Sequence, residues 1–100
     1  MIYAIVQDQN FHLRFYLSRY LKQKRMGLDI SQLTAAEAVG LTLGQYRSVE
    51  SGKAKLTIQT LERLYDLLRL DMAELWEVVR ISKVAYANAV TKELSRNYPE

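Results

Sequence analysis

The 100-residue sequence contains no cysteine, a single histidine and a single proline. Without cysteine there are no disulfides, no thiolate nucleophile and none of the common zinc clusters, and one histidine cannot complete a histidine metal site. The sequence also lacks the glycine-rich loops that hold nucleotide phosphates, and it has no nucleophile with a histidine base nearby. We therefore expect a protein that is not an enzyme and that needs no metal or cofactor.

Long apolar runs and targeting signals are missing as well. No run approaches the length of a membrane span, and Met1 to Gln7, MIYAIVQ, lacks the basic flank and the length of a signal peptide. The length, with 49% hydrophobic residues, suits one globular domain over residues 1–100. We therefore expect a single-domain cytoplasmic protein.

The net charge is only +3, but the basic residues are clustered. No acidic residue stands between Asp8 and Asp29, whereas five basic residues do: Arg14, Arg19, Lys22, Lys24 and Arg25. A solvated face is the ordinary explanation of such a cluster. Phosphate contact becomes the better explanation when a nucleic-acid-binding motif accompanies it.

Apolar spacing and capping residues predict an all-α chain. Ser31 caps a short helix over about residues 32–39, which Gly40 stops, and Thr42 with Gln45 forms a capping box for the next helix. The other predicted helices run over about residues 11–25, 58–68 and 72–96, the last either continuous or broken near Ser82. The stripe expected to be buried on the helix over 58–68 is Ile58, Leu61, Leu64, Tyr65 and Leu68. The state of the apolar run at the start of the chain is ambiguous.

The segment from Ser31 to Lys53 is the most informative part of the chain. It spaces two short helices around a tight turn at Gly40 and ends in a helix that is stopped by Gly52. That layout is typical of a helix-turn-helix, whose second helix lies in the major groove of DNA.

The chain resembles the lambda-repressor-like, or Cro/C1-type, helix-turn-helix family over about residues 10–76. The matching residues are Arg25, Gln32, Ala36, Gly40, Leu41, Thr42, Val49, Glu50, Gly52, Leu61, Leu68 and Leu75. The resemblance implies a five-helix DNA-binding domain, usually dimeric on a two-fold operator. Departures from the family pattern are Leu56 in place of a frequent proline, Asp29 and Arg69 in place of frequent glycines, and Tyr46 in place of valine or isoleucine.

The resemblance and the helix geometry together assign roles to individual residues. The residues expected to read bases are Leu43, Gly44, Gln45, Arg47 and Ser48. Gln45 is suited to adenine and Arg47 to guanine, whereas Leu43 and Gly44 cannot donate a hydrogen bond. The residues expected to contact phosphates are Gln32, Thr42, Tyr46, Lys53 and Lys55. In the family, positions Arg25 and Glu50 form a partly buried ion pair whose role is structural.

The last predicted helix is apolar on too much of its surface to pack on one side only. We expect residues 77–100 to form a helical extension that dimerises through Val79, Tyr86, Val90 and Leu94. The alternative is that this helix covers its own core, with the apolar start of the chain against it.

The sequence thus predicts a DNA-binding transcriptional regulator, with a repressor that binds a two-fold operator as a homodimer as the leading hypothesis. Its partner is double-stranded DNA. Two alternatives remain open: a protein-interaction module, acting as an anti-activator or adaptor on a helix-turn-helix scaffold, and the DNA-binding antitoxin of a toxin–antitoxin pair.

Overall fold

The computed structural model describes residues 9–97, with side chains over 11–95. Five helices and no strand occur in this range, which confirms the predicted all-α class. The apolar run at Met1–Gln7 lies outside the described residues. The helices are α1 (Gln9–Gly27), α2 (Gln32–Ala38), α3 (Leu43–Glu50), α4 (Ile58–Leu67) and α5 (Met72–Asn97).

Three of the helices begin at hydroxyl caps that the sequence indicates. The Ser31 hydroxyl accepts a hydrogen bond from the Thr34 amide at 3.0 Å at the start of α2. Thr42 does the same for α3, where the full capping box with Gln45 is present, and Thr57 does so for α4. These bonds satisfy amides that a helix otherwise leaves unpaired at its N-terminus.

The chain turns sharply at four residues with positive φ. Two are glycines, Gly40 at 75° and Gly52 at 78°, and two carry side chains, Asp29 at 55° and Arg69 at 52°. Asp29 and Arg69 stand where the resembling family often has glycine, so the chain keeps the left-handed turns despite losing the glycines. A left-handed side-chain-bearing residue is strained by about 1 to 2 kcal/mol.

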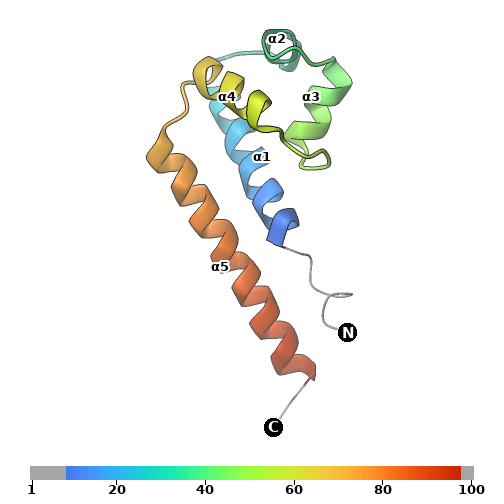
Figure 1. Cartoon of the computed structure of the whole chain (residues 1–100), viewed down its shortest axis with the longest axis vertical. Coiled ribbons are helices and arrows are strands. Elements are labelled where there is room, and N and C mark those ends of the chain that lie inside the picture. Colours follow the sequence, from blue (N-terminus) through green and yellow to red (C-terminus); the bar gives the residue numbers. More distant parts are fainter. Residues whose placement is uncertain (1–8, 98–100) are drawn as a thin grey trace.

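The core lies where α2, α3 and α4 meet the C-terminal half of α1 (Figure 1). Its fully buried members include Leu21, Val39, Tyr46, Leu64 and Leu68. The prediction that Ile58 belongs to this core is wrong, because its side chain is 83% exposed at the first position of α4.

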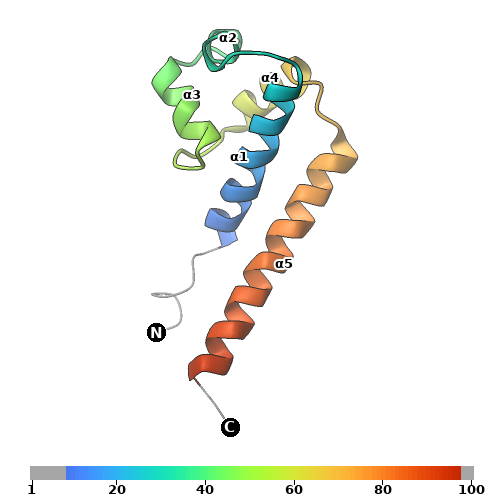
Figure 2. The same cartoon turned by 180° about the vertical axis from the view of Figure 1, so that it is seen from behind.

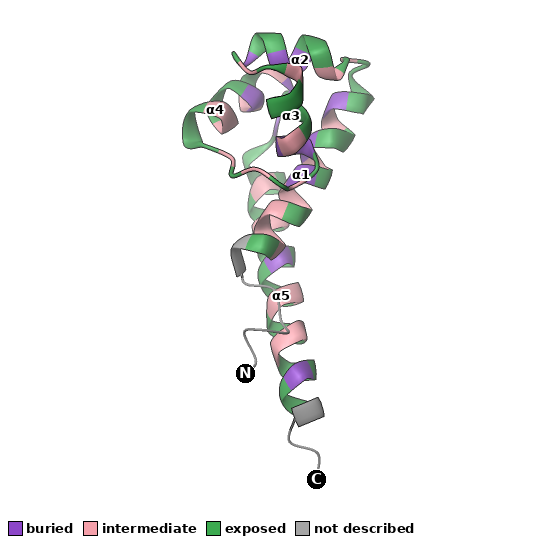
Figure 3. Cartoon of the chain, turned by 90° about the vertical axis from the view of Figure 1, so that its right-hand side faces the viewer, coloured by how far each residue is buried: buried purple, intermediate pink, exposed green. Residues whose placement is uncertain are grey.

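Helix α5 is one unbroken helix that runs antiparallel to α1 and continues past the first turn of α1 (Figures 1 and 2). Ser82, where a break was an open alternative, is instead buried, with 1% of its surface exposed, and its hydroxyl donates to the Val79 carbonyl. Figure 3 shows buried and half-buried residues recurring along the length of α5, separated by exposed ones.

Polar contacts fasten the start of α5 to α1. The Tyr20 hydroxyl donates to Glu74 at 2.9 Å, and Lys24 donates to the same carboxylate oxygen at 3.3 Å. Burial and the bond to Glu74 raise the pKa of Tyr20 to about 12. The Asp71 carboxylate caps the Glu74 amide at 3.0 Å, but the Glu74 side chain turns to α1 instead of completing a capping box.

Candidate nucleic-acid interface

The exposed part of α3 and the loop that follows it carry most of the residues predicted to contact DNA. Gly44, Gln45 and Arg47 are exposed, while Leu43 and Ser48 are half-buried. Beside them lie further exposed residues with donors for phosphates, Thr42 at the helix start and Lys53 and Lys55 in the loop. Of the predicted base-reading residues, Gly44, Gln45 and Arg47 are thus exposed on α3, with three of the predicted phosphate contacts before and after the helix.

Gln45 has a second role that limits how it can read a base. Its carbonyl oxygen accepts from the Thr42 amide at 2.9 Å, while its own amide donates to the Thr42 hydroxyl at 3.1 Å. A bidentate pair with adenine needs both atoms of the side-chain amide. Gln45 closes the capping box in this conformation, so pairing with adenine requires its oxygen to leave the Thr42 amide.

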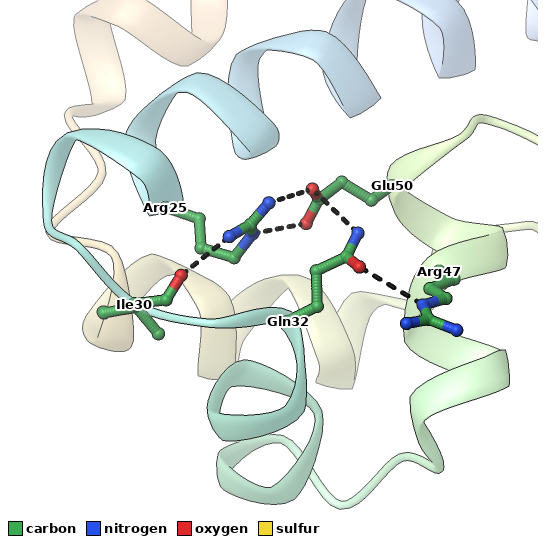
Figure 4. A network of polar contacts seen from close by, with 5 residues as sticks. All are labelled: Arg25, Ile30, Gln32, Arg47 and Glu50. Carbon is green, nitrogen blue, oxygen red and sulfur yellow. Dashed lines mark hydrogen bonds and ion pairs between the residues drawn. The ribbon is translucent and has the colours of Figure 1, made fainter.

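A chain of polar contacts runs from α1 through α2 to the outer edge of α3 (Figure 4). Arg25 donates to Glu50 through Nε at 2.9 Å and through Nη2 at 2.7 Å, and its Nη1 donates to the Ile30 carbonyl at 2.7 Å. The Gln32 amide nitrogen donates to Glu50 at 3.3 Å, and its oxygen accepts from Arg47 Nε at 3.3 Å. The first residue of α2 therefore joins a buried ion pair to an exposed arginine of the reading edge.

The ion pair at the start of this chain is almost completely removed from water. The Arg25 side chain is 10% exposed and that of Glu50 is 3% exposed. Burial is the largest single influence and raises the pKa of Glu50, but the hydrogen bonds and positive charge of Arg25, together with Tyr46 and Gln32, outweigh it and hold the pKa below its usual 4.5. The carboxylate therefore stays ionised and fixes the end of α3 to α1.

The prediction that Tyr46 contacts a phosphate is wrong. Its side chain faces the core and is 1% exposed, because the aromatic ring fills the slot that a branched aliphatic residue fills in the resembling family. Within the described part of the chain its buried hydroxyl has no hydrogen bond of good geometry. Burial, with the neighbouring Glu50 carboxylate, raises the pKa of this hydroxyl.

Sequence reasoning missed two residues that shape the turns on either side of α3. Arg63 of α4 donates to the Val39 carbonyl at 3.0 Å and lies where a Cβ on Gly40 would approach to 3.1 Å. Ser18 of α1 is buried, and its hydroxyl would lie 3.3 Å from a Cβ on Gly52. Neither contact leaves a local pattern, because each joins residues more than twenty positions apart.

The basic cluster of α1 is not one surface. Arg25 is buried with Glu50, Lys24 bonds to Glu74, and Arg14 is half-buried. Arg19 and Lys22 remain exposed, and the Arg19 guanidinium lies 5.4 Å from the centre of the Phe15 ring. Ion pairs within the protein therefore account for two of the five basic residues, Lys24 and Arg25.

The residues of the predicted dimer stripe on α5 differ in their exposure and in their contacts with α1. Tyr86 lies against His12 of its own α1, with ring centres 5.7 Å apart, so this part of the stripe prediction is corrected. Val79 and Val90 are half-buried, whereas Leu94 is 46% exposed.

Residues 9–97 hold no cluster of three or more side chains suited to a metal ion. Over the same range, no helix combines the length and the apolar character that crossing a bilayer requires.

Comparison with known families gives one match. A family model described as helix-turn-helix matches residues 21–75, which are more than half of the chain. No curated protein and no solved structure matches. The matched range contains the last two turns of α1, all of α2, α3 and α4, and the first residues of α5.

Proposed function

Because this chain belongs to the lambda-repressor-like, Cro/C1-type helix-turn-helix family, it is a DNA-binding transcriptional regulator, and we propose that it is a repressor that binds a two-fold operator as a homodimer. The observation that carries this proposal is the exposed edge of α3, fixed from behind by the buried Arg25–Glu50 pair. A rigid reading helix enters the major groove without rearranging.

Arg47 is the residue we expect to read a base. Its guanidinium is exposed, and its Nε is held by Gln32, which leaves the two terminal nitrogens for the O6 and N7 acceptors of guanine. Thr42 and the first amides of α3 lie where a phosphate would be held. Lys53 and Lys55 add phosphate contacts from the loop, and Leu43 offers contact to a thymine methyl group.

The sequence predicts that Gln32 contacts a phosphate, whereas its side chain is engaged within the protein. Both ends of its amide are engaged, one by Glu50 and the other by Arg47. A direct phosphate bond from Gln32 requires that one of these bonds be given up. Gln32 therefore supports the interface chiefly by orienting Arg47.

The homodimer is supported by apolar side chains that α5 leaves in water. Met72, Trp76 and Leu94 are exposed, with Trp76 at 66% and Leu94 at 46%. Trp76 and Leu94 stand five full helical turns apart and so lie on one line of the helix. The half-buried Val79 and Val90 lie beside that line, so a second copy would cover an apolar stripe that the exposed Lys83 interrupts near its middle.

Repression needs nothing beyond occupancy, because a dimer bound across a promoter blocks polymerase. Selection of bound sequences from a random duplex pool, at a stated salt concentration, tests the proposal. A palindromic product with half-sites one helical turn apart is expected. No enrichment at low salt, or enrichment of a single asymmetric site, would contradict the DNA-binding or the dimer part respectively.

The role of Arg47 is tested by its replacement. Arg47→Ala is expected to weaken binding to the selected site by about 1 to 3 kcal/mol and to relax the preference at one base pair in each half-site. Arg80→Ala is the matched control, because Arg80 is an exposed arginine on α5, away from the reading edge. Equal losses in both variants would show that Arg47 supplies charge only.

A second function is favoured by one observation, the presence of Leu43 and Gly44 at positions that open the reading helix. Neither donates a hydrogen bond, so this end of α3 suits contact with a protein surface as well as with DNA. In that case the chain acts as an adaptor or anti-activator. Binding to duplex DNA with a log–log salt slope of about −0.9 per phosphate contact would decide against it.

A further inference from the structure

A half-open groove of about 530 Å³ lies between α1 and the start of α4. Leu13 and Leu17 line it from α1, and Leu56 and Leu61 line it from the opposite side. Its volume falls within the range of about 300 to 1,000 Å³ that is typical of small-molecule sites. Ile58 also lines it, with 83% of its surface in water, so a ligand here would cover apolar surface.

The walls of the groove are too short for a partner helix. The α1 wall runs from Leu13 to Leu17, which is about one turn or about 6 Å. The opposite wall consists of the chain that leads into α4 and the first turn of that helix, from Lys55 to Leu61. A helix that docks in a groove is held by side chains at i, i+3, i+4 and i+7, which extend over about 10 Å. A small molecule therefore fits these walls better than a helix does.

The polar side chains of the groove favour an anion. Arg14 and Lys55 contribute to the lining, and none of the described lining residues is acidic. Within the described part of the chain neither cation forms an ion pair. The Nε of Arg14 is buried there without a hydrogen-bond partner, so the arginine has bonding capacity that the protein leaves unused. A second copy docked through the same surface would bring two like charges, which opposes that occupant.

We propose that the groove binds a small amphiphile with a single carboxylate, of the class of medium-chain fatty acids. The hydrocarbon chain lies along the leucines of the two walls, and the carboxylate bonds to Arg14 and Lys55. The apolar chain supplies most of the affinity, whereas the two cations select an anionic head group.

Lys55 connects this site to the surface proposed to bind DNA. Together with Thr57 it also lines a second hollow of about 310 Å³, next to Gln45 and Ser48 of α3. A carboxylate bound to Lys55 removes this lysine from the phosphate that the proposed function assigns to it. The ligand therefore weakens DNA binding, a consequence that rests on the proposed function, whereas the ligand site itself does not.

NMR titration of the full, isotope-labelled chain tests the site without DNA. The ligands are hexanoate, octanoate and octan-1-ol, each below the concentration at which it forms micelles or separates. We expect octanoate to shift the methyl signals of Leu13, Leu17 and Leu56, and to bind more tightly than hexanoate by up to a factor of about four for each added methylene. Octan-1-ol has the same chain without the charge and should bind at least about fivefold more weakly than octanoate.

Two variants, each with a matched control, test the residues of the site. Arg14→Gln should weaken octanoate binding at least about fivefold and leave octan-1-ol binding unchanged. Arg19→Gln changes an exposed arginine of the same helix that does not line the groove, and it should alter neither. Ile58→Glu places an anion at an exposed position of the groove, where it cannot disturb the core, and should also weaken octanoate binding. Val84→Glu, at an exposed apolar position of α5, is its control, and this pair decides if Arg14→Gln fails to fold.

Three results would overturn the site. They are signals that shift at Trp76 of α5 in place of the groove leucines, equal affinity for octanoate and octan-1-ol, and equal losses in the variants and their controls. Absence of binding below the micelle-forming concentration would overturn it as well.

The effect on DNA is measured separately, by fluorescence anisotropy of a labelled duplex carrying the selected site. Saturating octanoate should weaken DNA binding several-fold and reduce the log–log salt slope by about 0.9, the value for one phosphate contact. Octanoate bound in the groove with unchanged DNA affinity would overturn the coupling. Failure to bind any duplex would overturn the proposed function instead, and the titration without DNA still decides the ligand site.

Discussion

Replacing Glu50 by alanine isolates the energetic role of the buried ion pair. The substitution removes both acceptors of Arg25, those at 2.9 and 2.7 Å, and leaves the guanidinium with only its bond to the Ile30 carbonyl. The Arg25 side chain is 90% buried in the natural chain, and alanine supplies no new acceptor for it. A buried charge that loses its partner costs about 3 to 5 kcal/mol.

That loss is large compared with the stability of a domain of this size. Small domains unfold with about 5 to 15 kcal/mol, and each kcal/mol changes the melting temperature by about 4 to 8 °C. We therefore expect Glu50→Ala to lower the melting temperature by at least about 12 °C. DNA affinity falls as well, because the end of α3 is released from α1. Thermal unfolding followed by circular dichroism, at one fixed protein concentration, measures the effect.

The surface pair Arg80–Glu77 provides the control. Its side chains are 63% and 52% exposed, so water replaces the lost contact, and Glu77→Ala should leave the melting temperature almost unchanged. The double variant Arg25→Met, Glu50→Leu should recover much of the stability, because it removes the stranded charge. A melting temperature for Glu50→Ala no lower than that for Glu77→Ala would refute the reasoning.

Three further predictions follow from the same contacts. The pKa of Glu50 in the folded state lies below its usual 4.5, so the stabilisation that the Glu50 carboxylate supplies is present above pH 4.5 and is lost as the pH falls through the folded pKa. Unfolding titrations should therefore show a steeper loss of stability below about pH 4.5 for the natural chain than for Glu50→Gln. Tyr46→Phe should preserve or raise the free energy of unfolding in urea and leave DNA affinity unchanged, since it removes a hydroxyl that is buried in the core and has no hydrogen bond of good geometry. A loss of DNA affinity like that of Arg47→Ala would contradict the placement of Tyr46 away from DNA. Arg69→Gly should raise the free energy of unfolding by up to about 1 kcal/mol because the residue has a φ of 52°, whereas Gly40→Ala should lower it, and the opposite order would contradict the strain argument.

The local signals in the sequence predicted the helices well. Each cap needs only residues three positions apart, so Ser31, Thr42 and Thr57 specify helix starts whatever surrounds them. Burial depends instead on which elements pack together. Ile58 has helical spacing with Leu61, yet it stands at the first position of α4 with no element over it among the described residues.

At the candidate interface, too, the sequence predicts the local features better than the contacts between distant residues. Its framework follows from motif residues, whereas the partners of individual side chains depend on rotamers and on distant elements. Tyr46 has the same spacing whether its hydroxyl points outward or inward, and it is the packing of α3 against the other helices that buries it. Gln32 and Arg47 meet across 15 positions, a contact that no local pattern indicates.

The continuity of α1 has a mechanical consequence. One helix of 19 residues holds the reading helix through Arg25, near its C-terminal end, and lies against α5 both beside that end, through Tyr20 and Lys24, and at its other end, through His12. A straight helix of this length is about 28 Å long and transmits a tilt without absorbing it. Because α5 is bonded to α1 beside Arg25, we expect a partner that tilts α5 to shift the reading helix, although it touches neither α3 nor DNA.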